Sequence, residues 1–96
     1  ELAQILYLES FGHTCLLYTR EESFQVKKGI SEVEKELGAL GLPVFRNHRS
    51  YLVNLGQVTG VGREAAALAG GREVPVSRTQ YQALNRAFIR LFRREG

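Results

Sequence analysis

Short β-forming segments, each ended by turn residues, place the strongest constraint on how this chain can fold. Residues 5–8 are apolar, residues 14–19 are rich in β-forming side chains, and residues 23–26 alternate polar and apolar side chains with the period of a half-buried strand. Gly12 and the Gly70–Gly71 pair supply the positive φ angles that tight turns need. This pattern predicts small antiparallel sheets.

The middle of the chain continues the same pattern. Further short strands are expected at residues 44–45, 57–61, 65–69 and 72–76. Pro75 favours an edge position for the last of these, because proline has no backbone N–H to donate to a neighbouring strand. The segment 46–50 between the strands is polar and basic, and the segment 51–55 that follows it is apolar.

Two segments have helical periodicity instead. The first is residues 30–40, in which Ser31 and Glu34 have the spacing of a capping box. Its apolar face comprises Ile30, Val33, Leu37 and Leu40. The opposite face is rich in glutamate, so this helix is expected to face away from any nucleic acid. Gly41 and Pro43 are expected to end it.

The second helical segment begins at Ser77, which is expected to be its N-cap. An apolar stripe runs along it through Tyr81, Leu84, Phe88 and Leu91. Together with the strands, the two helices predict a mainly-β fold of short antiparallel sheets with one short helix and one C-terminal helix. A length of 96 residues is expected to form a single domain, residues 1–96.

Composition narrows the function. Cys15 is the only cysteine, which excludes an internal disulfide and a cysteine-based zinc site, and the chain contains no Asp to help two histidines bind a metal. We therefore expect no metal, no cofactor and no enzymatic activity, and a reducing, cytoplasmic setting. The chain starts at Glu1 and has no Met, so it is expected to be part of a longer regulator.

The net charge of +3 comes with an excess of Arg over Lys. The planar guanidinium fork suits phosphates and guanine edges, so this excess is compatible with a nucleic-acid surface. A GC-rich genome would give the same excess, and composition alone does not separate the two explanations.

Several motifs resemble the LytTR family of DNA-binding domains. Residues 45–55, Phe-Arg-Asn-His-Arg-Ser-Tyr-Leu-Val-Asn-Leu, resemble its F-x-R-x-H-x-S-x-x-V-N signature, with the spacing around the Arg shorter by one residue. Residues 74–78, Val-Pro-Val-Ser-Arg, are similar to its I-P-V-S-R motif, and residues 5–10 to its I-x-Y-I-E-S/A opening. Residues 30–40 resemble its S-L-x-x-L-E-x-x-L helix, although Ile-Ser replaces Ser-Leu.

The resemblance implies an elongated fold of about ten short strands whose loops enter two successive major grooves of double-stranded DNA. It also implies the output domain of a bacterial two-component response regulator that binds direct-repeat promoter sites as pairs of protomers. An upstream regulatory domain such as a phospho-receiver would then be its partner within the longer protein, and no membrane would be involved.

Three residues are expected to contact bases, on the positions that match the family's pattern: His13, Arg49 and Arg78. A guanidinium can donate two hydrogen bonds to guanine O6 and N7, while a histidine is a weaker, more shape-dependent reader. The alternatives are a solvated turn histidine, a surface arginine paired with a carboxylate such as Glu73, and a helix-start arginine without a role.

A second set is expected to contact phosphates, which fixes the register of the protein on DNA without reading sequence. This set comprises Asn47, His48, Ser50, Tyr51 and Ser77. A structural role is the alternative for His48, and for Asn54 we favour hydrogen bonds to buried loop backbone. The cations Arg86, Arg90, Arg93 and Arg94 in the last helix could extend the phosphate footprint, but a solvated helical face is the preferred interpretation.

Functions other than DNA binding have weaker support in the sequence. A non-catalytic protein-interaction or ligand-sensing module of the same fold is the main alternative. Single-stranded RNA binding would need exposed aromatic side chains for stacking, and only Phe11 and Tyr51 are candidates. A catalytic pair formed by Cys15 and a histidine is not expected, since the strand that carries Cys15 should pack inward.

Overall fold

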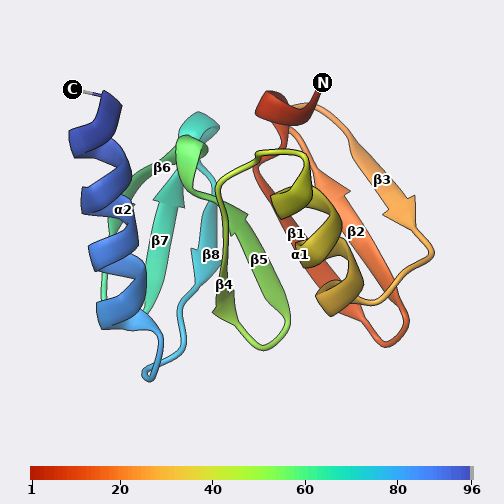
Figure 1. Ribbon diagram of the computed structural model, residues 1–96. Coiled ribbons are helices and arrows are strands. Elements are labelled where there is room, and N and C mark those ends of the chain that lie inside the picture. Colours follow the sequence, from red (N-terminus) through yellow and green to blue (C-terminus); the bar gives the residue numbers. More distant parts are fainter. Residues whose placement is uncertain (96) are drawn as a thin grey trace.

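The computed structural model of the protein describes residues 1–95, with side chains placed as far as Arg93. Eight strands form two antiparallel sheets, and two α-helices pack against them (Figure 1). The mainly-β prediction is confirmed, with eight strands where about ten were expected. The body measures 34 × 28 × 25 Å. Neither helix in the described part of the chain has the length and hydropathy needed to cross a membrane.

The larger sheet has five strands in the order β3-β2-β1-β5-β4. Its strands are β1 (Tyr7–Phe11), β2 (Thr14–Tyr18), β3 (Ser23–Val26), β4 (Val44–His48) and β5 (Tyr51–Asn54). The first strand begins later than its apolar run suggested, because Leu2–Gln4 form a short 3-10 helix (η1) that Ile5 ends. Strand β1, the first strand of this sheet along the chain, pairs with β5, the last one.

The smaller sheet has three strands in the order β6-β7-β8. Its strands are β6 (Val58–Val61), β7 (Ala65–Leu68) and β8 (Glu73–Pro75), and the 3-10 helix η2 (Leu55–Gln57) connects it to β5. Pro75 therefore lies in an edge strand, as expected. Gly70 and Gly71 in the β7–β8 connection (η3, Ala69–Gly71) have φ angles of 83° and 82°, which confirms the need for glycine there.

Helix α1 (Ile30–Ala39) buries Ile30, Val33 and Leu37 against the larger sheet. Two details of the predicted helix are wrong. Gly29 is the N-cap and no side chain caps the helix, so Ser31 and Glu34 do not form a capping box. Leu40 lies just past the end of the helix and is 64% exposed rather than part of the apolar face.

Helix α2 (Tyr81–Glu95) begins three residues later than an N-cap at Ser77 predicts. Ser77 is not its N-cap, because the Ser77 carbonyl accepts a 3.0 Å hydrogen bond from the Gln80 N–H and closes a turn over residues 77–80. The first helical bond is donated by the Leu84 N–H to the Gln80 carbonyl, at 2.8 Å. Arg78 consequently lies in the turn before the helix rather than at the helix N-terminus.

Two apolar clusters hold these layers together. One lies between α1 and the larger sheet and includes Leu8, Cys15 and Leu52. The other joins both sheets to α2, and it includes Val53 from the larger sheet, Val74 from the smaller sheet and Leu84 from α2. Burial raises the pKa of the Cys15 thiol, so this inward-facing side chain, as expected, is an unreactive part of the core.

Asn54 is buried at the end of β5 and hydrogen-bonds backbone, as favoured from the sequence. Its Nδ2 donates to the Ile5 carbonyl at 2.7 Å, and its Oδ1 accepts from the Gly56 N–H at 2.9 Å. These bonds satisfy two backbone groups where the chain crosses from one sheet to the other.

We predict that Asn54→Ala lowers the free energy of unfolding by about 1–3 kcal/mol, because both backbone groups lose their partner without gaining water. Denaturant unfolding measures this loss. Asn85→Ala, at a partly exposed position in α2, is the matched control and should change stability little. Equal effects of the two substitutions would contradict the structural role of Asn54.

Candidate nucleic-acid interface

The three predicted base-contacting residues lie along one edge of the molecule. Antiparallel pairing brings the β1–β2, β4–β5 and β6–β7 turns and the β8–α2 connection to the same side, which is the lower edge in Figure 1. His13 is in the first of these turns, Arg49 in the second, and Arg78 in the β8–α2 connection. All three side chains are exposed. We call this side, defined by these three residues, the loop edge.

His13 occupies a two-residue hairpin turn that Phe11 and Thr14 close. Gly12 comes before it with a φ of 66°, and a positive φ at the first central residue is the geometry of a tight type II′ hairpin. This turn carries the exposed imidazole beyond the end of the sheet. The hairpin is joined to the next tip along the edge, since the Ser10 N–H donates a 2.8 Å hydrogen bond to the Ser50 carbonyl.

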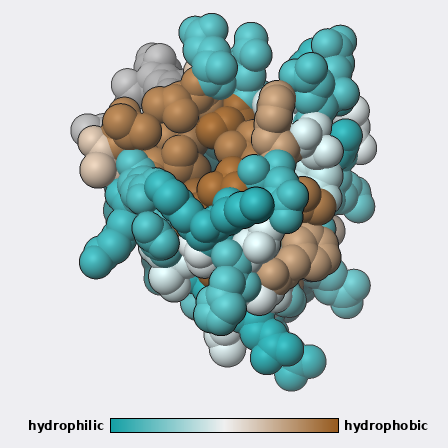
Figure 2. All heavy atoms as spheres, turned by 90° about the vertical axis from the view of Figure 1, so that its right-hand side faces the viewer, coloured by the Kyte–Doolittle hydropathy of each residue, from teal (hydrophilic) through white to brown (hydrophobic). Residues whose placement is uncertain are grey.

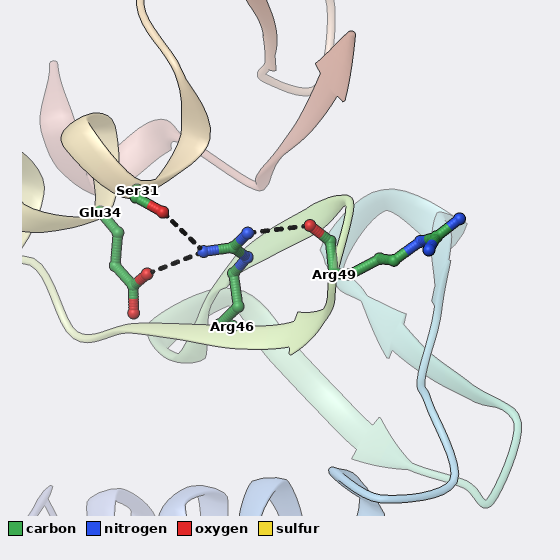
Figure 3. Close-up of polar contacts among 4 residues, drawn as sticks. All are labelled: Ser31, Glu34, Arg46 and Arg49. Carbon is green, nitrogen blue, oxygen red and sulfur yellow. Dashed lines mark hydrogen bonds and ion pairs between the residues drawn. The ribbon is translucent and has the colours of Figure 1, made fainter. Parts of the chain in front are cut away.

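Arg49 projects from the β4–β5 tip, and Arg46 holds that tip in place (Figure 3). The Arg46 guanidinium donates to the Arg49 carbonyl at 2.9 Å, and on its other side to Glu34 at 3.3 Å and Ser31 at 3.4 Å. Arg46 thus connects the start of α1 to the tip of the hairpin. The Arg49 side chain points away from this cluster, so its own guanidinium is directed outward.

His48 also shapes this tip. Its Nδ1 accepts a 3.1 Å hydrogen bond from the Ser50 N–H, which in the neutral ring leaves the proton on Nε2. The ring packs edge-on against Tyr51, with 5.5 Å between ring centroids. His48 therefore has a structural role, and its Nε2–H keeps the capacity to donate to an anion.

The structure contradicts one of the expected phosphate contacts. Asn47 is fully buried, at 0% exposure, because the alternation of β4 turns its side chain inward between Arg46 and His48. Its Nδ2 donates to the Pro75 carbonyl at 2.7 Å, and its backbone carbonyl accepts from the Ser77 N–H at 3.0 Å. Asn47 therefore connects the two sheets and cannot reach a phosphate.

Tyr51 stays a prediction as a phosphate contact. Its hydroxyl donates its single proton to the Glu9 carboxylate at 2.9 Å, so a phosphate would have to replace Glu9 as the acceptor. Burial, together with the hydrogen bond and the negative charge of Glu9, raises the pKa of Tyr51 to about 12. The ring belongs to an aromatic group between the sheets that also contains Tyr7 and Tyr18, whose rings stack 4.5 Å apart.

The bonds of Asn47 place the β4–β5 tip beside the turn at residues 77–80. The two segments share one concave surface, lined by Arg46, His48, Arg49, Ser77, Thr79 and Gln80. The Ser77 hydroxyl lies 3.4 Å from that of Thr79 and is partly exposed. Two of the lining side chains are arginines, and His48 adds the Nε2–H donor, which makes this surface suitable for a phosphate group.

Sequence reasoning missed Arg63. It lies in the β6–β7 turn and lines a second concave surface together with Arg78, and its guanidinium is 5.7 Å from the centre of the Tyr81 ring. The segment was recognised only as a turn, since nothing in the sequence shows that this turn reaches the same edge as Arg78. Glu64 lines the same surface and offsets part of its charge.

The remaining candidate cations lie elsewhere. Arg86, Arg90 and Arg93 line a shallow surface on α2 with Ile89, and they are not among the residues that line either concave surface of the loop edge. Arg94 falls outside the residues whose side chains the structure describes.

Comparisons with known proteins identify the family and the fold. The family model described as the LytTr DNA-binding domain matches residues 1–89. A solved LytTR DNA-binding domain, assigned to a methyl-accepting/DNA response regulator from Bacillus cereus, has the same fold: the TM-score is 0.75 at 22% sequence identity, over 92% of this chain and 83% of that one. No curated protein matches the sequence. The family match spans nearly the whole chain, and the protein therefore belongs to the LytTR family of DNA-binding domains.

Proposed function

We propose that this domain binds double-stranded DNA sequence-specifically through its loop edge, as the output domain of a bacterial response regulator. The observation that carries the proposal is the common position of His13, Arg49 and Arg78, each exposed and each at the tip of a turn on one edge. Side chains at loop tips can reach base edges in a groove that the sheets themselves are too broad to enter.

We assign each residue a role from the hydrogen-bond donors that its side chain offers. Arg49 and Arg78 would donate to guanine O6 and N7, and His13 would contact a base edge in the neighbouring groove. The partly buried His48, Ser50 and Ser77 lie beside the arginines and would hold phosphates, with the Arg46 charge close by. Arg63 is added to this set because it shares a surface with Arg78.

The wider assignment rests on family membership and on the B. cereus domain of the same fold. An upstream receiver-type domain would regulate this one, and pairs of protomers would occupy direct repeats in promoters, in the cytoplasm. The domain itself would supply binding and no catalysis.

Selection of bound sequences from a random duplex library, at two salt concentrations, tests the proposal. We expect a repeated motif with a spacing of about 10–11 base pairs, because protomers on one face of DNA are separated by a helical turn. Raising the salt should weaken binding and leave the selected motif unchanged. Recovery of random sequence at both salt concentrations would contradict sequence-specific binding and favour the protein-interaction alternative.

We predict that Arg78→Ala weakens specific binding by about 1–3 kcal/mol and relaxes the preference at one base pair, because a two-bond contact to guanine is lost. Binding to single-base variants of the selected site measures both effects. Arg86→Ala is the matched control on α2 and should leave the base preference unchanged, altering the salt dependence at most. If Arg78→Ala retained full specificity with a normal melting temperature, Arg78 would not read a base.

We also predict that Arg46 acts by positioning Arg49. Arg46→Lys keeps the charge but cannot bridge Glu34, Ser31 and the Arg49 carbonyl at once, so it should weaken specific binding by about tenfold. In the background of Arg49→Ala the same substitution should have little further effect, since the side chain that it orients is gone.

A double-mutant cycle for specific DNA binding measures this coupling. Additive effects of Arg46→Lys and Arg49→Ala would contradict the positioning role and assign Arg46 an independent contact. Loss of the coupling, while Arg49→Ala still alters base preference, would leave the proposed function intact and remove only the role of Arg46.

A further inference from the structure

Part of the larger sheet has an exposed apolar face. Helix α1 packs mainly on β1, β4 and β5. On the same face it covers Cys15 of β2, whereas Leu17 of β2 is only partly buried and Phe24 of β3 is exposed. Leu2, Ile5, Leu17 and Phe24 line a hollow there, and Phe24 is 49% exposed. Figure 2, which views the molecule from the β3 side, shows apolar side chains gathered around a hollow with hydrophilic residues at its border.

This face ends at an open strand edge. β3 is the outermost strand of the sheet, and no other strand of residues 1–95 pairs with its outer side (Figure 1). The Thr19 N–H donates to the Glu22 carbonyl at 2.9 Å, so Glu22 directs its carbonyl toward β2. Because backbone direction alternates along an antiparallel strand, Phe24 and Val26 also bond to β2, whereas Ser23 and Gln25 direct their N–H and C=O groups outward.

The charges on either side of β3 are opposite. Glu21 and Glu22 come before the strand, and Lys27 and Lys28 follow it. An exposed edge flanked by charge normally resists pairing with another strand. A second copy of the same segment, paired antiparallel, is the exception. The lysines of each copy then lie beside the glutamates of the other copy, so opposite charges meet at both ends of the pair.

We propose that β3 pairs with β3 of a second copy of this chain, forming a continuous ten-stranded sheet from the two five-stranded ones. Gln25 of each copy lies opposite Gln25 of the other, and the two exchange backbone hydrogen bonds. A two-fold axis perpendicular to the sheet keeps like faces together, so Phe24 of one copy lies opposite Val26 of the other. The two apolar hollows then meet on the same side of the joined sheet.

The existing contact of Lys28 does not oppose this pairing. Lys28 bonds to Glu36 at 2.9 Å, but both side chains are more than two-fifths exposed, so the ion pair contributes little to stability and can exchange. A second copy offers what an unrelated strand would not: acid opposite base at both ends, and apolar side chains opposite each other between them.

The symmetry has a consequence for DNA that rests on the proposed function. Antiparallel pairing inverts the second copy, so the two loop edges face in opposite directions. The dimer would therefore bind two separate duplexes rather than two adjacent sites on one. Self-association itself is measured without DNA, so the two proposals can fail independently.

Two charge-reversed variants test the pairing. We expect that Glu21→Lys with Glu22→Lys, and separately Lys27→Glu with Lys28→Glu, each weaken self-association by about tenfold or more, because like charges then face each other at both ends. An equimolar mixture of the two variants should associate again as a heterodimer, since both ends are complementary once more. Sedimentation over concentrations that reach the millimolar range measures each state.

Arg86→Glu with Arg90→Glu on α2 is the matched control, a reversal of two charges far from β3, and should leave self-association unchanged. Gln25→Pro removes an outward N–H without touching the β2–β3 ladder and should also abolish the dimer. A natural chain that stays monomeric throughout, or a mixture of the charge-reversed variants that fails to associate while both are folded by circular dichroism, would overturn the proposal.

Discussion

The loop edge depends on one residue whose side chain does not itself reach the surface. The Asn47 side chain donates to the Pro75 carbonyl at 2.7 Å, and the Asn47 backbone carbonyl accepts from the Ser77 N–H at 3.0 Å. Together these bonds fix the end of the larger sheet against the end of the smaller one. The apolar cluster shared by both sheets and α2 brings them together, but burial is not directional. The hydrogen bonds of Asn47 set the alignment that places Arg49 beside the turn at residues 77–80.

Stability and recognition are divided between different parts of the fold. The core is made of aliphatic side chains and an aromatic group, whereas the loop edge carries solvated cations that contribute little to folding. Arg46 belongs to both parts, because it donates hydrogen bonds to Glu34, Ser31 and the Arg49 carbonyl. These bonds restrict the β4–β5 tip in the unbound protein. Restriction of this kind lowers the entropic cost of binding.

Local patterns in the sequence predicted local structure well. The bounds of β3, the glycine turns, the edge position of Pro75 and the role of Asn54 follow from strand alternation and turn chemistry. Proximity in sequence to an exposed loop is a poor guide to the exposure of a single side chain. Asn47 belongs to a basic segment, yet its side chain faces the core and donates to the Pro75 carbonyl. Arg63 was missed because the placement of the smaller sheet is a long-range property.

The central claim is that DNA meets the edge formed by residues 12–13, 46–50 and 77–80. Amide shift changes during titration of the labelled domain with its selected duplex test it most directly. The account predicts that the largest changes fall in those three segments and in the turn at residues 62–64, with little change along β3 or the outer face of α2. Changes concentrated on α2, with the three segments unaffected, would contradict it.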